Sequence, residues 1–475
     1  MVQIHELSAV EQYRLIQRRE LGVLEAVDHY LDRIERLDPE LGAFHTVTPG
    51  AARERARMLD AADDRTAPLW GLASADKDLA RRAGVRTTFG SRLFEQFVPE
   101  STDALPTQLD AAGTVSLGKT ATPEFGLASY TENHVAPPTR DPYDLALGPG
   151  GSSGGAAVAV AAGLLPFATG TDGGGSIRIP AAACGLVGLK PSRGLVPAGS
   201  GVDSLAGLPV AGPLARSVPD AAMLLDGMIA RHGDRIQHPF TLRAPVDDDG
   251  AFLGAALRGE GRFQIGLTTW SPWDTAYDIR IEPEAQDALA VARDALVELG
   301  HGLEEFTPEA APQYPDAFRV IWQVGAGTLP ADDTNEHLLE PLTRWLMHRG
   351  RALPATDLAA ALGTLSAFER SIIRQFDRYD AVLTPALAQT PRPIGWYDAE
   401  DGERNFEQQC QYTPFTSFVN VSGLPAISLP VHVTASGLPM GAQLIGRPGG
   451  ESTLLSLARQ LERRLRWDTR HPPQY

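Results

Sequence analysis

Two glycine- and serine-rich segments carry residue types that can perform acyl transfer. Residues 150–155 read GGSSGG, and residues 173–176 read GGGS. A serine hydroxyl becomes an effective nucleophile when a nearby base takes its proton. Glycines leave backbone N–H groups free to approach the negative charge that develops on a carbonyl oxygen. The two segments therefore indicate hydrolysis through a serine, and glycine-rich turns of purely structural use are the alternative.

Lys77 is a candidate for the base. It lies in a mainly apolar run from Leu72 to Leu79, and burial there would lower its pKa from about 10.4 toward neutral pH. A neutral amine can accept a proton from a serine. The adjacent Asp76 and Asp78 would oppose this shift, but neighbours in a strand point to the opposite face. An exposed lysine paired with these acids is the alternative.

Two short motifs match the sequence but not its context. Residues 113–120 (GTVSLGKT) fit the phosphate-binding P-loop, which requires a flexible loop followed by a helix. Here Val115 and Leu117 alternate as in a strand. Residues 74–77 (SADK) fit the Ser-x-x-Lys motif of penicillin-recognising enzymes, which requires a helix. We expect both segments to be strands, with no bound nucleotide.

A third motif leaves a second enzyme class open. Residues 151–155 contain Gly-x-Ser-x-Gly centred on Ser153, as at the nucleophile elbow of α/β-hydrolases, and an apolar helical pattern follows at 156–164. That class also needs an acid and a histidine. His432 lies in a β-like run, and His471 lies in a proline-rich tail. An α/β-hydrolase with Ser153 as nucleophile is therefore an alternative prediction.

The elements that must position these residues form an α/β pattern. Between residues 70 and 215, short apolar runs alternate with helical patterns and dense glycine, as in a core of strands and helices. Residues 1–65 contain helices that pack on this core, one of them with a capping-box pattern at Ser8 and Glu11. Residues from about 220 to 375 are more helical and more charged. No repeat or long linker interrupts the 475 residues, so we expect a single domain.

Composition and charge exclude several classes of partner and of site. The chain has 42 Lys and Arg against 59 Asp and Glu, a net charge of −17, which argues against nucleic acid or an anionic membrane as a partner. Its two cysteines, Cys184 and Cys410, exclude a disulfide framework and a cysteine-based zinc site. The longest near-apolar stretch, 156–168, is too short to span a bilayer. The first residues lack a secretory signal pattern, and we expect a cytoplasmic protein.

Taken together, the motifs resemble the amidase signature family. The resemblance is strongest over residues 150–155, 170–180 and 184–191, and it covers most of the chain except about 220–375. Other matching segments are 77–78, 118–120, 124–125, 379–385, 423–426 and 437–443. The resemblance implies a single α/β domain in which helices cover a central mixed β-sheet, with about 220–375 as a variable helical region on the substrate side.

The resemblance also implies roles for individual residues. Ser176 would be the nucleophile, and Lys77 would be the base. Ser152, which would follow a cis peptide bond in the chain, would relay protons between them. The other implied members are Gly173, Gly174 and Gly175 in the oxyanion hole, Ser153, Asp172 and Arg178 as supports, and Thr131 and Asn133 in a loop beside the substrate. No metal and no organic cofactor are implied. Asp76 departs from the family pattern, which usually has an apolar residue there.

We therefore expect an amidohydrolase that cleaves the C–N bond of a small neutral amide through an acyl-enzyme, as a monomer or a homodimer. One alternative is an ester or carbamate hydrolase that uses the same residues. Another is the glutaminase-type subunit of a tRNA-dependent amidotransferase. Aromatic residues of the poorly matched regions could line an acyl pocket, and they are Trp322, Trp345, Trp396, Tyr397, Phe415 and Phe418.

Overall fold

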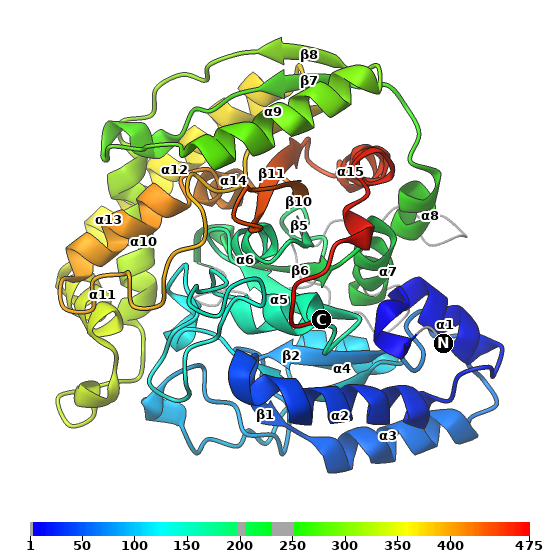
Figure 1. Ribbon diagram of the computed structural model, residues 1–475. Helices are drawn as coiled ribbons and strands as arrows, with labels where there is room; N and C mark the ends of the chain where they lie inside the picture. The colour runs from blue at the N-terminus through cyan, green and yellow to red at the C-terminus, as the bar shows by residue number, and fades with distance from the viewer. Residues whose placement is uncertain (1–2, 197–204, 230–250) are drawn as a thin grey trace.

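An eight-stranded mixed sheet occupies the centre of the molecule in the computed structural model, which describes residues 3–196, 205–229 and 251–475 (Figure 1). Strand β7 pairs in parallel with β8 and β9, and the other neighbouring pairs are antiparallel. In sheet order the strands are β4 (Phe167–Asp172), β6 (Val210–Ala215), β5 (Val187–Lys190), β10 (Ala426–Val433), β11 (Pro439–Gly446), β9 (Ala381–Pro385), β7 (Gln264–Leu267) and β8 (Gly302–Glu305). The expected α/β class with a mixed sheet is confirmed.

A separate three-stranded sheet carries Lys77. It consists of β1 (Phe44–Val47), β3 (Val115–Thr120) and β2 (Ala73–Lys77), in that order, with β2 parallel to β3. The segments that match the P-loop and Ser-x-x-Lys motifs are thus strands, as predicted. Gly118 is required in β3 because a Cβ there would lie 2.0 Å from the carbonyl oxygen of Thr46. Strand β2 also packs against β4 of the large sheet.

Helices flank both sheets. The α-helices are α1 (Ala9–Gln17), α2 (Val23–Leu41), α3 (Pro49–Ala61), α4 (Ala104–Ala111), α5 (Gly154–Ala161), α6 (Arg178–Ala183), α7 (Val218–Met228), α8 (Ala251–Arg258), α9 (Pro283–Glu298), α10 (Tyr314–Gly327), α11 (Pro341–Ala352), α12 (Ala355–Phe376), α13 (Gly402–Tyr412), α14 (Ser417–Ser422) and α15 (Glu451–Leu465). The short 3-10 helices are η1 (Ile4–Glu6), η2 (Arg92–Phe94), η3 (Glu124–Gly126), η5 (Pro272–Thr275), η6 (Glu336–Leu338) and η7 (Trp467–Thr469). None of the described helices is long and apolar enough to cross a bilayer.

The N-terminal helices α1 and α2 are stabilised by a capping box and by an apolar stripe, both of which are visible in the sequence. The capping box at the start of α1 is present, since Ser8 Oγ accepts from the Glu11 backbone N–H at 3.1 Å and the Glu11 carboxylate accepts from the Ser8 N–H at 2.8 Å. Helix α2 buries the apolar stripe of Val27, Leu31 and Ile34 in the main core. The expected helical region of about 220–375 contains α8 to α12, and its residues 230–250 lie outside the described residues.

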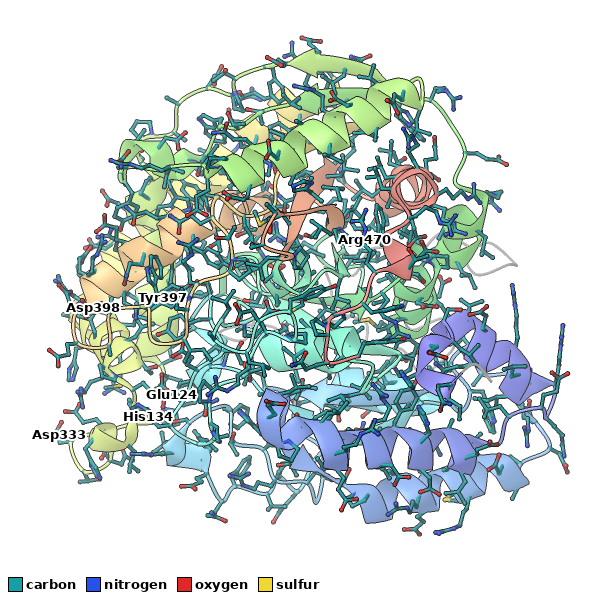
Figure 2. All side chains as sticks on the ribbon, viewed as in Figure 1. Glu124, His134, Asp333, Tyr397, Asp398 and Arg470 are labelled. Atoms are coloured by element: carbon teal, nitrogen blue, oxygen red, sulfur yellow. The ribbon has the colours of Figure 1, made fainter. Side chains whose placement is uncertain are left out.

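Two glutamates, Glu124 and Glu340, are linked between η3 and the start of α11, beside the loop that leads to Ser129. Glu124 accepts from Ser91 Oγ at 2.5 Å and from the Glu340 backbone N–H at 2.8 Å. Glu340 in turn accepts from the backbone N–H of His134 at 3.1 Å (Glu124 and His134 are labelled in Figure 2). Burial and the neighbouring carboxylates, Glu124 before Glu132, raise the pKa of Glu340 to about 8.

Replacing Glu340 by glutamine should stabilise the protein at alkaline pH. Because the pKa of Glu340 is raised from 4.5 to about 8, the folded state holds a proton that the unfolded state has released, and stability falls as pH rises through this window. Glu340→Gln removes that loss. Urea unfolding should show the variant more stable than wild type by about 1–3 kcal/mol at pH 8 and nearly equal to it at pH 4.5. The exposed Glu400→Gln is the control, and an equal gain there would contradict the argument.

Candidate active site

Lys77 ends strand β2 with its amine buried among uncharged oxygens. The residue is 2% exposed. The Nζ atom donates to Ser152 Oγ at 2.7 Å, to Ser153 Oγ at 2.9 Å and to Thr171 Oγ1 at 3.0 Å. None of these acceptors carries a charge. The structure thus brings Lys77, Ser152 and Ser153 together, as the sequence predicts.

The surroundings of Lys77 favour its neutral form. Burial lowers the pKa of Lys77 to about 7, and the more distant charge of Asp172 opposes the shift. The flanking acids are engaged elsewhere, because Asp76 accepts from Arg82 Nε at 2.7 Å and Asp78 accepts from Thr88 Oγ1 at 2.5 Å. The prediction that these neighbours point away from the lysine is confirmed. The pairing of Asp76 with Arg82 also accounts for an acid at a usually apolar position.

Ser152 and Ser153 precede helix α5, and the peptide bond between Gly151 and Ser152 is cis, as the resemblance implies. Ser153 is fully buried and bonded on both sides, because its hydroxyl accepts from Lys77 and donates to the Thr171 carbonyl at 3.2 Å. No histidine is among its described hydrogen-bond partners. This environment contradicts the α/β-hydrolase alternative, which requires an accessible Ser153 next to a histidine.

The loop from Gly173 to Ser176 joins strand β4 to helix α6. The Asp172 carboxylate accepts from the backbone N–H of Gly175 at 2.7 Å and from that of Ile177 at 3.2 Å. The Gly175 N–H is therefore already used, in contrast to its expected role. In the described part of the chain, the N–H groups of Gly173, Gly174 and Ser176 have no acceptor.

Asp172 and Arg178 form a buried ion pair that stabilises this loop. The two side chains form a doubly hydrogen-bonded ion pair at 2.9 and 3.0 Å, with both residues fully buried. Burial alone would raise the pKa of Asp172, but the Arg178 guanidinium lowers it to about 2. Asn420 joins the pair from helix α14, donating to the Asp172 carboxylate at 2.9 Å and accepting from Arg178 at 2.7 Å. Gln443 accepts from the remaining guanidinium nitrogen at 2.7 Å.

Ser176 is the member of the predicted triad that faces open space. It is 8% exposed and lines a pocket. Across residues 3–196, 205–229 and 251–475, its hydroxyl has no hydrogen-bond partner, so the link from Ser152 to Ser176 is not formed in this structure. The structure therefore holds the Lys77 amine against Ser152, and it places the Ser176 hydroxyl on the pocket wall.

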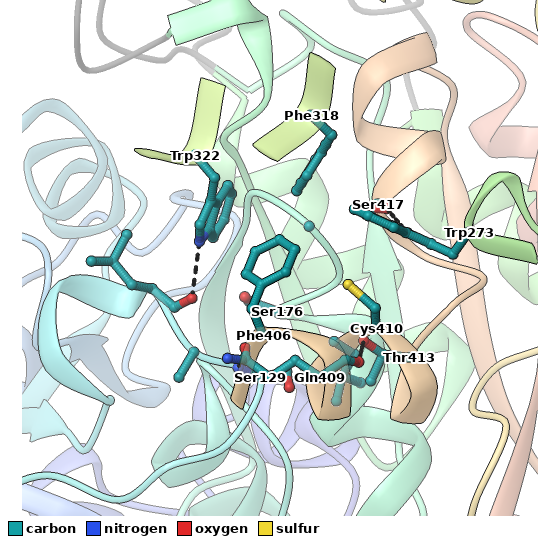
Figure 3. A pocket seen from close by; sticks show the side chains of 14 residues that line it. Ser129, Ser176, Trp273, Phe318, Trp322, Phe406, Gln409, Cys410, Thr413 and Ser417 are labelled. Carbon is teal, nitrogen blue, oxygen red and sulfur yellow. Dashed lines mark hydrogen bonds between the residues drawn. The ribbon is translucent and has the colours of Figure 1, made fainter. Parts of the chain in front are cut away.

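The pocket around Ser176 is aromatic and uncharged. Figure 3 shows Ser176 near the side chains of Phe318, Trp322 and Phe406. Its lining residues are Leu127, Ala128, Ser129, Gly174, Ser176, Ile179, Trp273, Phe318, Trp322, Phe406, Gln409, Cys410, Thr413 and Ser417. None of them is an acid or a base. A ligand that fills this pocket therefore needs no charge of its own, and a charged one would lack a partner.

Several expected pocket residues lie elsewhere. Of the six aromatic candidates, Trp322 lines the pocket, while Trp345, Trp396, Tyr397, Phe415 and Phe418 do not; the last is fully buried in the core. Trp345, Trp396 and Tyr397 pack in one hydrophobic cluster, which is the commoner use of large apolar side chains. Thr131 and Asn133 do not line the pocket either. Thr131 Oγ1 donates to the Gly150 carbonyl at 2.8 Å, and Asn133 donates to the Thr122 carbonyl at 2.9 Å.

Sequence reasoning missed Thr171 and Asn420, which contact the site directly. Thr171 could have been found, because alternation in β4 puts it on the face opposite Asp172, toward Lys77. Asn420 gives no such signal, since it meets Asp172 from a helix far along the chain. Within the described residues, no group of three or more His, Cys, Asp or Glu side chains could hold a metal ion.

Comparisons with known proteins agree with this architecture. A family model described as Amidase matches residues 25–455. A protein named "Putative amidase AmiB2" from Mycobacterium tuberculosis (strain ATCC 25618 / H37Rv) is 36% identical over 477 residues, covering 98% of this chain and 97% of its own length. The solved structure of 6-aminohexanoate cyclic dimer hydrolase superposes with a TM-score of 0.89 at 29% identity and covers 100% of both chains. A glutamyl-tRNA(Gln) amidotransferase subunit of Nitratidesulfovibrio vulgaris (strain DP4) is 34% identical, over 98% of each chain.

Proposed function

This chain belongs to the amidase signature family of hydrolases, and from that premise we propose that it hydrolyses small uncharged carboxylic amides through an acyl-enzyme on Ser176. The main support is the environment of Lys77. A lysine whose pKa lies near 7 and whose acceptors are serine and threonine oxygens can take up a proton at neutral pH.

The proposed reaction moves one proton along the chain of hydroxyls. Rotation of the Ser176 side chain closes its gap to Ser152, whose oxygen accepts the Ser176 proton while its own proton passes to Lys77. The Ser176 oxygen attacks the amide carbon. The free N–H groups of Gly173, Gly174 and Ser176 are the donors available to the oxyanion.

Breakdown of the tetrahedral intermediate reverses the proton path. Lys77 returns its proton through Ser152 to the amide nitrogen, which leaves as a neutral amine, because an amide anion is a very poor leaving group. The acyl group then remains on the Ser176 oxygen. Water attacks that ester with the same residues as the base, which releases the carboxylic acid and restores the serine.

The pocket favours an uncharged amide over glutamine. Glutamine carries an ammonium and a carboxylate, and binding both in a buried site requires partner charges. The lining residues supply none.

A substrate comparison tests the proposal. Phenylacetamide, which is uncharged and aromatic, should be hydrolysed with a kcat/KM at least 100-fold above that of L-glutamine, with ammonia release as the measurement for both. The phenylacetate ester and the carbamate analogue are measured alongside, and the relative rates show which leaving group the enzyme prefers. Faster turnover of glutamine than of phenylacetamide would contradict the proposed substrate class.

A further inference from the structure

Ser417, at the start of helix α14, is held on the pocket wall by two aromatic side chains. Trp273 Nε1 donates to Ser417 Oγ at 3.0 Å, and the hydroxyl oxygen of Tyr314 lies 2.8 Å from the same atom. All three residues are buried, and both Trp273 and Ser417 line the pocket (Figure 3). This arrangement is part of the substrate pocket but plays no part in the proton path proposed above.

The hydrogen atoms of this group can be assigned by elimination. An indole N–H can only donate, so Trp273 occupies one lone pair of Ser417. Tyr314 is 1% exposed, and burial raises the pKa of its hydroxyl well above the usual value, so it keeps its proton. Ser417 is its hydrogen-bond partner within the described chain. Tyr314 therefore donates to Ser417, because the reverse arrangement would leave a buried O–H without an acceptor.

Ser417 is then left with one hydrogen and no free lone pair. A serine hydroxyl has two acceptor positions and one donor, and both acceptor positions are filled by Trp273 and Tyr314. No described protein group accepts the Ser417 hydrogen. Because Ser417 lines the pocket, the place left for an acceptor is the pocket itself.

The other hydroxyl groups of the wall, on Thr413 and Ser129, do not offer a free hydrogen to the pocket. Thr413 Oγ1 donates its hydrogen to the Gln409 carbonyl at 3.0 Å. The Gln409 amide oxygen accepts from the Ser129 N–H at 2.8 Å, and one of its two N–H groups donates to Asn405 at 2.7 Å, so its second N–H is the one other side-chain amide donor of the wall. The Ser129 hydroxyl oxygen has no hydrogen-bond partner among the described residues, but the atom has almost no accessible surface and so does not reach the open space of the pocket. Among the hydroxyl groups of the wall, Ser417 is thus the one besides Ser176 whose hydrogen is available to a bound acyl group.

We propose that Ser417 is a specificity-determining donor, and that the preferred substrates are neutral amides whose acyl group carries an uncharged acceptor oxygen, such as an ether or a ketone. The inference rests on the proposed function. An acyl group without such an oxygen leaves the Ser417 hydrogen unpaired once water is displaced. A carboxylate in its place would accept the bond but would find no cation in the wall.

Matched substrates test this without any variant. The three methoxyphenylacetamides are compared with their ethyl isosteres, in which CH₂ replaces oxygen. At least one positional isomer should be hydrolysed about 3- to 10-fold faster, in kcat/KM, with methoxy than with ethyl. Hydrolysis of phenylacetamide with no methoxy preference at any position would overturn this inference alone. Absence of hydrolysis across the whole series would instead overturn the proposed function and this inference with it.

Variants then assign the preference to Ser417. In Ser417→Ala the methoxy-to-ethyl ratio should fall to about 1, whatever the change in overall rate, since both substrates lose the same packing. In Ser417→Thr, which keeps the hydroxyl, the ratio should be retained. If the alanine variant does not fold, the threonine variant and the wild-type ratios still decide. An unchanged ratio in a folded Ser417→Ala protein would contradict the assignment.

Discussion

Ser176→Ala should lower kcat/KM by about 10⁴-fold or more, which is the usual effect of removing a serine nucleophile. The variant should fold normally, because the Ser176 hydroxyl has no hydrogen-bond partner within the described residues and lies on the wall of the pocket. Amide hydrolysis measured over several hours, with thermal unfolding as the check on folding, tests the expectation. Residual activity within 10-fold of wild type would contradict the role of Ser176.

Ser153→Ala is the matched control for that experiment. Ser153 is one of the acceptors for Lys77 but is fully buried and outside the pocket. Its loss should slow turnover by far less than the loss of Ser176. A fluorophosphonate should therefore label Ser176 in both wild type and Ser153→Ala, as read by peptide mass mapping. A label on Ser153 would restore the α/β-hydrolase alternative.

Lys77→Met should abolish turnover while keeping the volume of the side chain. We expect a loss of about 10³-fold or more, because without the amine no base receives the serine proton. In the wild type only the neutral amine is active. With a pKa of about 7 for Lys77, kcat/KM should rise about 10-fold per pH unit below pH 7 and level off above it. A flat profile between pH 5.5 and 7 would contradict the role of Lys77 as base.

The same substitution should make the protein more stable at neutral pH. The folded-state pKa of Lys77 is lowered from 10.5 to about 7, so between these values the unfolded chain binds a proton that the folded one does not. Stability therefore increases as pH rises through this window, and at pH 7 the buried lysine costs a few kcal/mol. Urea unfolding should show Lys77→Met more stable than wild type at pH 7, with a smaller difference at pH 9.5.

Lys190→Met separates the two expected effects of Lys77→Met, which are the loss of activity and the gain of stability. Lys190, in strand β5, is also fully buried with a pKa lowered to about 7 by burial, then by Arg178, and its amine donates to the Pro191 carbonyl at 3.0 Å. It does not line the pocket. The Lys190 variant should gain stability in the same pH range and retain far more activity than Lys77→Met. Equal inactivation by both substitutions would show that the activity loss is structural.

What the sequence predicts well is local. The alternation in residues 113–120 correctly identifies a strand in place of a P-loop, and the same alternation separates Lys77 from its acidic neighbours. These conclusions need only the geometry of one strand. The α/β class and the mixed sheet are also predicted, although the strand order is not.

What the sequence could not supply depends on contacts between distant segments. The pocket joins Trp273 from η5, Phe318 from α10 and Phe406 from α13, and nothing local distinguishes these aromatic residues from those that fill the core. Which of them line the pocket is decided by the positions of the helices around the sheet. The use of the Gly175 N–H by Asp172 is local by contrast, because the two residues are three apart, and aspartates commonly accept from nearby backbone N–H groups in turns.

The strand order has a consequence for folding while the chain is being synthesised on the ribosome. Strand β5 pairs on one side with β6, close in sequence, and on the other with β10, where Lys190 lies opposite Ala426. Until the last part of the chain is synthesised, the β5 edge has no neighbour, and unpaired edges invite association with other chains. Pairings between such distant residues also form slowly. During most of synthesis the nascent chain therefore has an unpaired β5 edge, to which a chaperone could bind.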